Sequence, residues 1–493
     1  MSRSEADALP SARGFLGQPA GLLVLCVTEA LERFSQYGIQ GILVLFLISP
    51  ESTGGLAMTT AEATSVFGIY VAIVYLLSMP GGMVADRMTG LRKAVVIGAV
   101  IILIGSMTMA LPLRAGIWPG MLLVAIGTGL LKPNISALVG ELYGDGEDGG
   151  RSRDVGYSIF FVAVNIGAFV AFLICGFVGR TFGWHQGFAV AGMGIAVGIL
   201  VYVSSAHKSL GDIGLAASRP LTGSERARLT RNVGLVVCAV GVVVFLLAVT
   251  GLITVELMVV VLAVMVVLIP VGYFVKLGRE LRGRGAELRR VQGFMWVFTA
   301  AVCFWMIASQ MGSTLIIFSQ NHASRYIGDY HFPASWERAA DPITIILLSP
   351  LFVMLWMRLG DRGPSVPTKF AAAIFLVGIS FLVMGVLSTM AEDGLIGWGW
   401  LAGVICVQAI AAILLSPAGL AASSRLSPVG RQGEFLALWF LTVATGYALG
   451  GQLARLKPFL GDVHYFSLLG VLVIGLAGLL FLGRTRLPRL MEA

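Results

Sequence analysis

Long apolar runs alternate with short charged segments along most of the chain. Each run has about 20 residues, the length that a helix needs to cross a hydrocarbon core roughly 30 Å thick. The pattern predicts fourteen spanning helices. They are expected at 20–48, 63–85, 92–113, 116–140, 154–179, 185–205, 231–251, 254–276, 291–320, 341–358, 369–390, 398–424, 431–456 and 462–482.

The composition agrees with an all-α polytopic membrane protein. Of the 493 residues, 57% are hydrophobic and only 12% are charged, so the chain is too apolar for one soluble core. Its net charge of +8 would fit a nucleic-acid-binding protein, but the location of the basic residues indicates membrane topology instead. We therefore expect contact with the lipid bilayer and none with nucleic acid.

The basic residues predict the orientation. If the N-terminus is cytoplasmic, Lys and Arg concentrate in the cytoplasmic segments, as the positive-inside rule requires. The outer loops then hold only Arg114, Arg180, Arg325, Arg338, Arg455 and Lys457. The first 19 residues are polar and the first apolar run is long enough to span, so we expect no cleavable signal peptide. The protein is predicted to lie in the cell membrane with both termini cytoplasmic.

Two loops rich in positive charge, 206–231 and 276–290, flank an apolar pair of helices at 231–276. This pair is interpreted as a hairpin inserted between two six-helix halves; the alternative is one continuous fourteen-helix bundle. The predicted organisation is a tail at 1–19, an N-terminal bundle at 20–205, a linker with the hairpin at 206–290, a C-terminal bundle at 291–482 and a tail at 483–493.

The first span carries three charges, each costing about 2.5 to 3.5 kcal/mol at the centre of a bilayer. Helical spacing places them on one polar stripe, formed by Glu29, Glu32, Arg33, Gln36, Tyr37 and Gln40. Glu29 and Arg33 are spaced for an ion pair, and Glu32 is a spare carboxylate suited to reversible protonation. The alternative is a buried pair that only fixes helix packing.

Further polar residues lie in later spans. Lys132 precedes Pro133 in the fourth span, which indicates a polar cavity or, alternatively, a cationic anchor near the cytoplasmic end. Tyr75 and Asn165 face either substrate or a neighbouring helix. The cysteines and histidines form no metal-ligand pattern, and no nucleotide-binding loop occurs. We therefore expect a transporter with no metal and no cofactor, not an enzyme or a receptor.

Several motifs resemble known transporters. The charged turn Gly81–Lys93 is similar to the signature loop of the major facilitator superfamily. Four further segments, together with the inserted hairpin, resemble the proton-dependent oligopeptide transporter family over nearly the whole chain. They are ExxERFSxYG from Glu29, GTGLLKPN from Gly127, RDVGYSIFFVAVNIGAF from Arg153 and LLSPAGL from Leu414, and the FWxxxxQ pattern at Phe304–Gln310 agrees with them.

The resemblance implies a major facilitator fold of two six-helix halves with alternating access. It implies that Glu29, Glu32 and Arg33 are linked to the proton, and that Arg33 and Lys132 approach a peptide carboxylate. The central cavity would be lined by Tyr37, Tyr75, Asn165, Trp305 and Trp439.

The chain departs from the family pattern at three positions. Gln40 and Ser309 replace the arginine and the glutamate that pair across the outer gate in the family, and Ala412 replaces a glutamate that attracts the peptide amino group. Glu337, Arg338 and Asp341 occupy positions that are usually neutral. We hypothesise that they face the cavity and compensate; the alternative is a solvated helix cap.

The expected function is proton-coupled symport of short peptides or peptide-like compounds, driven by the proton gradient, by a monomer. Gln40, Ser309 and Asp341 are counted among the candidate substrate-binding residues. The alternative is a transporter of the same fold that carries a non-zwitterionic compound, or that works as an exporter or facilitator.

Overall fold

The computed structural model describes residues 18–143, 149–218, 220–225, 227–228, 231, 254–428 and 431–483, without the side chains of 149–154, 361 and 432. The predicted terminal tails, apart from three residues next to the helices, and the predicted span at 231–251, apart from its first residue, lie outside the described residues. Every other predicted span coincides with one helix or, at 63–85 and 291–320, with two consecutive helices.

The helices in chain order are α1 Ala20–Ile48, α2 Thr60–Leu76, α3 Ser78–Val84, α4 Leu91–Ala110, α5 Ile117–Glu141, α6 Gly149–Thr181, α7 Trp184–Leu210, α9 Val255–Glu280, α10 Gly285–Ala308, α11 Thr314–His322, α12 Ala340–Leu359, α13 Val366–Met390, α14 Trp398–Leu426, α15 Gln432–Leu453 and α16 Lys457–Leu482. Four two-residue strands, β1 Ala323–Ser324, β2 Tyr326–Ile327, β3 Tyr330–His331 and β4 Ile396–Gly397, add short pairings that the all-α prediction did not contain. They lie in loops and leave the helical architecture unchanged.

Eleven helical stretches among the described residues are long and apolar enough to cross a membrane, and the last of them contains both α15 and α16. α1 is not among these stretches, because its polar stripe lowers its hydropathy. Its 29 residues are nevertheless long enough to span, and most of them are buried. The protein is therefore an integral membrane protein whose first helix is hidden inside the bundle.

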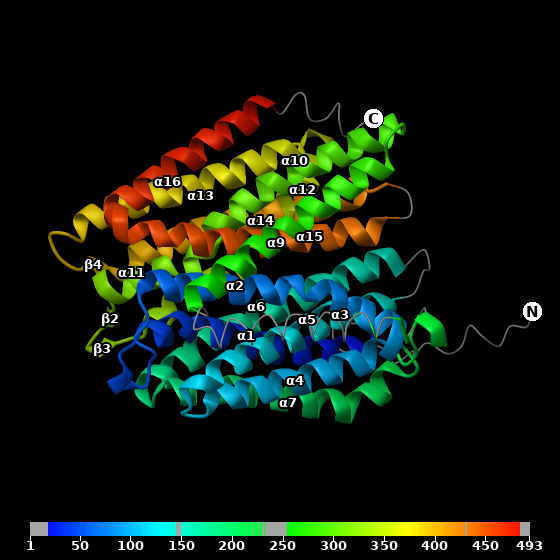
Figure 1. The fold of residues 1–493 in the computed structure, drawn as a ribbon, viewed down its shortest axis with the longest axis horizontal. Coiled ribbons are helices and arrows are strands. Elements are labelled where there is room, and N and C mark those ends of the chain that lie inside the picture. The colour runs from blue at the N-terminus through cyan, green and yellow to red at the C-terminus, as the bar shows by residue number, and fades with distance from the viewer. Residues whose placement is uncertain are drawn as a thin grey trace, which may run out of the picture.

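The helices form two layers around separate cores. α1 to α7 surround the first core, and most of the second core comes from α10, α13, α14, α15 and α16 (Figure 1). α9 contacts α2 and α15, so it lies along the seam between the two halves. We call the end of the bundle where α1 begins the proximal end, and the opposite end the distal end. α16 ends at the proximal end (Figure 1).

Two predicted spans are interrupted. The helix expected at 63–85 consists of α2 and α3 followed by a π-helical turn at Ala85–Thr89, and Gly90 with φ 77° allows the chain to enter α4. The helix expected at 291–320 consists of α10 and α11 joined by a 3₁₀ turn at Ser309–Gly312. Hydropathy does not detect such breaks because the apolar composition continues through them.

The signature turn braces neighbouring elements. Pro133 leaves the carbonyl of Gly129 without its helical partner, and a Cβ on Gly81 would lie 2.1 Å from that oxygen. Asn134 Nδ2 donates to the carbonyl of Gly81 at 3.2 Å. Glycine at position 81 therefore lets α3 approach the proline-distorted turn of α5, which carries Lys132.

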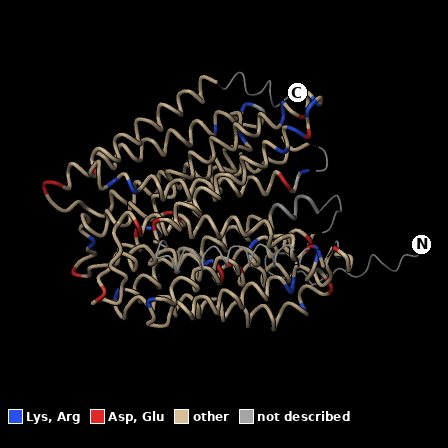
Figure 2. The backbone as a smooth tube through the Cα atoms, viewed as in Figure 1, with Lys and Arg blue, Asp and Glu red and all other residues tan. Residues whose placement is uncertain are grey.

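Lys and Arg among the described residues gather at the proximal end, in the turns after α3, α7 and α9 (Figure 2). Arg431 links α9 to the start of α15 through Glu280 at 2.8 Å. This bond to Glu280 raises the pKa of Arg431, so the guanidinium stays charged. The proximal end is the more positive face of the protein.

Candidate functional site

The polar stripe of α1 forms one connected cluster. Arg33 Nε lies 2.9 Å from Glu29 Oε1 and 2.7 Å from Glu32 Oε2, and Arg33 Nη1 donates to Gln36 Oε1. Glu29 is 2% exposed, Glu32 0% and Arg33 2%. Two carboxylates thus share one guanidinium in a site from which water is excluded.

Glu32 is the less satisfied of the two carboxylates. Neither of its oxygens has a hydrogen-bond partner among the described residues, although one lies within ion-pair distance of Arg33. Lys132 on α5 is a second cation that interacts electrostatically with the Glu32 carboxylate. A buried charge is costly unless it is paired and hydrogen-bonded, so a proton on this cluster would lower the cost of burial.

Lys132 connects the charged cluster of α1 to the aromatic side chains. Its Nζ lies 4.2 Å from the centre of the Tyr75 ring on α2, in cation–π geometry. Tyr75 and Lys132 are both half-buried, so neither is sealed inside a helix interface. The cation that is predicted to meet a substrate carboxylate therefore remains accessible.

A second group lies where α1, α6, α15 and the start of α12 meet. Tyr37 packs edge-to-face on Phe172 with ring centres 5.7 Å apart. The guanidinium of Arg338 lies 4.5 Å from the centre of the same Phe172 ring. Its Nη1 donates to the carbonyl of Gln40 at 3.0 Å. Arg338 is therefore buried in the seam, where it joins the C-terminal half to α1.

Asp341 lies beside this group at the first turn of α12. It interacts electrostatically with Arg338, Tyr37 and Tyr447. The residue is half-buried, and its carboxylate has no ion pair within 4.0 Å among the described residues, since Arg338 donates to Gln40 instead. Asp341 thus places a carboxyl group without an ion pair, among the described residues, between the two halves.

Glu337 lies elsewhere. It is buried and interacts with Arg325, which Gln320 also holds at 2.8 Å. One carboxylate oxygen of Glu337 has no hydrogen-bond partner among the described residues. The three residues that were proposed to compensate for the missing charges therefore do not form one group. Arg338 and Asp341 lie near Tyr37, and Glu337 lies beside Arg325 on the distal side.

Several predicted site residues make local contacts. Asn165 Nδ2 donates to the carbonyl of Phe161 at 2.8 Å, and Ser309 Oγ donates to that of Met306 at 2.9 Å. Trp439 is buried, and its ring occupies the space that a Cβ on residue 419 would need. By contrast, the indole N–H of Trp305 is buried without a partner in the described part of the chain.

Tyr447 on α15 and Phe172 on α6 belong to the central group but were not predicted from the sequence. Each lies in an apolar stretch of its helix, where an aromatic residue gives no polar signal. A single phenol or ring in a span usually serves packing. Only the tertiary arrangement places both next to Tyr37 and Arg338.

The hydrogen bonds between the two halves lie at the distal end of the described structure. Ser65 Oγ donates to the carbonyl of Gly451 at 3.0 Å, which joins α2 to α15. Trp336 Nε1 donates to the carbonyl of Leu173 at 2.9 Å, and Arg180 Nη1 to that of Phe332 at 2.8 Å. With the bond from Arg338 to Gln40, these contacts close the distal seam.

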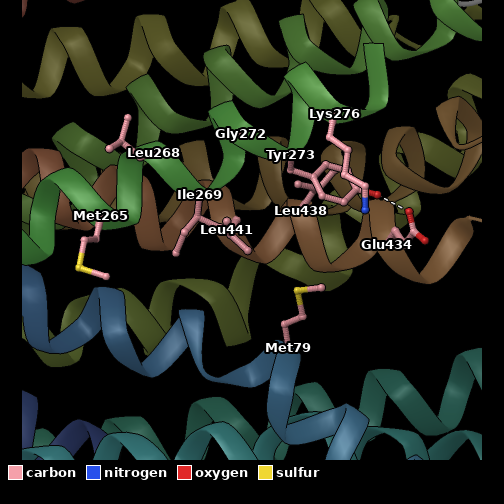
Figure 3. A pocket seen from close by; sticks show the side chains of 10 residues that line it. All are labelled: Met79, Met265, Leu268, Ile269, Gly272, Tyr273, Lys276, Glu434, Leu438 and Leu441. Atoms are coloured by element: carbon pink, nitrogen blue, oxygen red, sulfur yellow. Dashed lines mark hydrogen bonds between the residues drawn. The ribbon is translucent and has the colours of Figure 1, made fainter. Parts of the chain in front are cut away.

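Nearer the proximal end, the halves leave an apolar groove of about 520 Å³ between α3, α9 and α15. Figure 3 shows Met79 facing the groove from the N-terminal half, opposite α9 and α15. The polar end of the groove is formed by Lys276 and by Tyr273, which donates to Glu434. The described hydrogen bonds between the halves thus lie at the distal end, and the groove nearer the proximal end is lined mostly by α9 and α15.

Comparison with known proteins agrees with this geometry. The sequence profile described as the POT family matches residues 92–458. A di-/tripeptide transporter of Lactococcus lactis subsp. cremoris is 33% identical over 93% of this chain and 94% of its own. An uncharacterised transporter of Bacillus subtilis is 32% identical over 97% and 96%.

Solved structures agree as well. A peptide transporter POT in complex with sulfate superposes with a TM-score of 0.93 at 34% identity, covering 97% of both chains. A POT family transporter in complex with a thioalcohol-conjugated peptide gives 0.91 at 30% identity over 96% of this chain and 98% of its own. The fold is that of the major facilitator superfamily, and the chain belongs to the POT family of transporters.

Proposed function

We propose that this protein is a proton-coupled symporter that carries short peptides or peptide-like compounds by alternating access. Similar proteins named di-/tripeptide transporters support the substrate class. The closed distal seam and the proximal groove support the mechanism, because alternating access requires one side to open while the other is sealed. The proton gradient is the energy source, and the working unit is a monomer.

The positive proximal end faces the cytoplasm in this proposal, as the positive-inside rule requires. Both termini are then cytoplasmic and the distal end faces outward. The described conformation is accordingly inward-facing. The membrane is the cell membrane, across which a proton gradient directed inward can drive uptake.

One observation carries the proton-coupling proposal: two buried carboxylates share Arg33, and Glu32 accepts no hydrogen bond from the described residues. Lys132 is the other cation near Glu32. Lys132 stabilises the ionised form of Glu32. A substrate carboxylate that attracts Lys132 weakens this stabilisation, so Glu32 then binds a proton more readily. Substrate and proton thus favour each other's binding, as symport requires.

The substrate lies between two charged sites in this proposal. Lys132 and Arg33 attract its carboxylate, while Asp341 attracts its ammonium group in place of the glutamate that Ala412 replaces. Trp305 offers its free indole N–H, and Tyr37 and Tyr75 line the space between the charged ends. Asp341 restores an anion that ordinary zwitterionic peptides need.

The alternative is transport of a non-zwitterionic compound, by uptake, export or facilitated diffusion. It draws support from Arg338, because this cation donates to the carbonyl of Gln40 and is therefore less available to bind a substrate carboxylate. Competition separates the two proposals. Strong inhibition of uptake by di- and tripeptides favours the first, and no inhibition favours the second.

The test of proton coupling is Glu32→Gln in proteoliposomes with an imposed proton gradient. We expect the variant to lose gradient-driven accumulation and to retain counterflow exchange, because Gln keeps the shape of Glu but cannot titrate. Glu392→Gln on the exposed turn after α13 is the matched control and should accumulate substrate normally. Unchanged accumulation by Glu32→Gln would show that the proton binds elsewhere.

A further inference from the structure

A small hairpin projects from the C-terminal half at the distal end. β2 and β3 pair antiparallel, while β1 pairs with β4, so the hairpin is tied to the C-terminal half at its base. Its last residue, His331, contacts Arg180, which lies at the end of α6 in the N-terminal half. The hairpin therefore moves with one half and touches the other.

The contact depends on a neutral imidazole. Arg180 Nη1 donates to the carbonyl of Phe332 at 2.8 Å, and Arg180 Nη2 contacts His331 Nδ1. Because a guanidinium can only donate, Nδ1 must accept, which places the ring proton on Nε2. Tyr326 stacks on the imidazole with ring centres 4.7 Å apart and an interplanar angle of 21°, which holds the ring in this orientation.

The charged groups around His331 are predominantly cationic. Arg180 faces it from α6, and Arg325 faces it from the start of the hairpin. Two carboxylates belong to the surroundings: Glu337 acts on Arg325, and Asp329 lies two residues before His331 in the turn of the hairpin. Desolvation, followed by Arg180 and Arg325, holds the pKa of His331 below its usual value. His331 is thus neutral near pH 7 and gains a proton only in acid.

We propose that His331 and Arg180 form a proton-operated latch on the distal side: neutral His331 holds α6 against the hairpin, and protonated His331 releases it. A protonated ring has no lone pair at Nδ1 to accept from Arg180, and the two cations repel each other. The latch is distinct from the cluster around Glu32. Only one part of this proposal rests on the orientation proposed above, namely that the latch opens toward the acidic outer side.

The sign of the pH effect follows from linkage. If the closed latch lowers the pKa of His331 by one unit relative to the open state, the open state gains about tenfold in population once the pH is below both values. The gain is absent above the higher of the two values. Acid outside the cell therefore favours the state that receives substrate from outside.

The latch can be tested by measuring the distance between spin labels on the two halves. Leu113→Cys and Leu395→Cys place labels on exposed distal loops, in a background without native cysteines. In lipid nanodiscs, going from about pH 7.5 to about pH 5, a range that brackets histidine titration, should increase the long-distance, outward-open fraction several-fold. Glu32→Gln should leave that increase in place, which separates the latch from the proton-coupling cluster.

Two substitutions of His331 give opposite expectations. His331→Asn retains an acceptor near Nδ1 without a charge, so the closed fraction should be high and independent of pH. His331→Lys carries a permanent positive charge, so the open fraction should be high at both pH values. An acid-induced opening that persists in His331→Asn, or that is normal in His331→Lys, would overturn the proposal.

Discussion

At the scale of single residues, charge has been redistributed around the seam. The family pattern predicts an ion pair between positions 40 and 309, but the chain has Gln40 and Ser309 there. Arg338 instead approaches from the start of α12 and donates to the carbonyl of Gln40 at 3.0 Å. A backbone oxygen needs no particular side chain, so this contact tolerates the loss of the usual partner.

Asp341 gives a test of the proposed substrate site. In Asp341→Asn, we expect peptides with a free ammonium group to bind about ten to a hundred times more weakly, because hydrogen bonds to charged groups contribute about 1.5 to 3 kcal/mol. N-acetylated peptides should bind equally to both proteins. Isothermal titration calorimetry on purified protein measures the difference.

Asp393→Asn, on the exposed turn after α13, is the matched control and should bind all of these peptides normally. Equal weakening for free and acetylated peptides in Asp341→Asn would contradict an ammonium site. It would indicate a general effect on folding instead.

At the scale of elements, glycines set how closely helices pack. A Cβ on Gly127 of α5 would lie 2.6 Å from the carbonyl oxygen of Gly98 and 2.8 Å from the backbone nitrogen of Ile102, both on α4. Small residues allow such backbone contact in membranes, where association depends on packing. The same role recurs at Gly167, whose Cβ would lie 2.1 Å from the carbonyl oxygen of Ala30 on α1.

Gly127→Ala should therefore destabilise the fold. Alanine favours helix by about 1 kcal/mol over glycine, but forcing a methyl group into close packing costs about 1 to 3 kcal/mol. We expect a lower thermal midpoint for the detergent-solubilised variant, measured by tryptophan fluorescence. Gly272→Ala on α9 is the control, because no described atom lies within 4 Å of its Cβ, and its midpoint should stay unchanged or rise.

If Gly127→Ala were as stable as the parent protein, α4 and α5 would have to separate at little cost. That result would contradict the close contact. The hydropathy pattern of the two helices would be the same in either case.

At the scale of the whole molecule, the described polar contacts join the two halves at one end of the seam. Described polar contacts between the halves gather at the distal end, while the groove between α3, α9 and α15 lies nearer the proximal end. Contacts confined to one end fit the proposed alternating access, in which one end closes while the other opens. The contacts at the closed end set the population of this conformation, because each must be lost when that end opens.

Arg338→Gln should shift the population toward the outward-open state. The variant loses the donor to Gln40 and the cation above Phe172, an interaction of about 2 kcal/mol when desolvated. Ser335→Cys, buried in the distal seam, should then react several-fold faster with an impermeant maleimide added from outside. Arg358→Gln, exposed at the proximal end of α12, is the control. An unchanged reaction rate in Arg338→Gln would mean that other contacts hold the seam closed.

The sequence alone predicted the helical class, the positions of the described spans and the family. Spans follow from composition, because lipid forces backbone groups to pair within each helix. The cluster of Glu29, Glu32 and Arg33 was visible because charges are rare in spans and because helical spacing is local. The orientation toward the cytoplasm and the roles of the site residues remain predictions.

Only the tertiary structure decided which residues meet across the seam. It separated Glu337 from Arg338 and Asp341, although the three are close in sequence, and it brought Tyr447 and Phe172 into the central group. It also joined His331 to Arg180 across 151 positions. Such contacts depend on how two separately packed halves rest against each other, and no local pattern of residues encodes that arrangement.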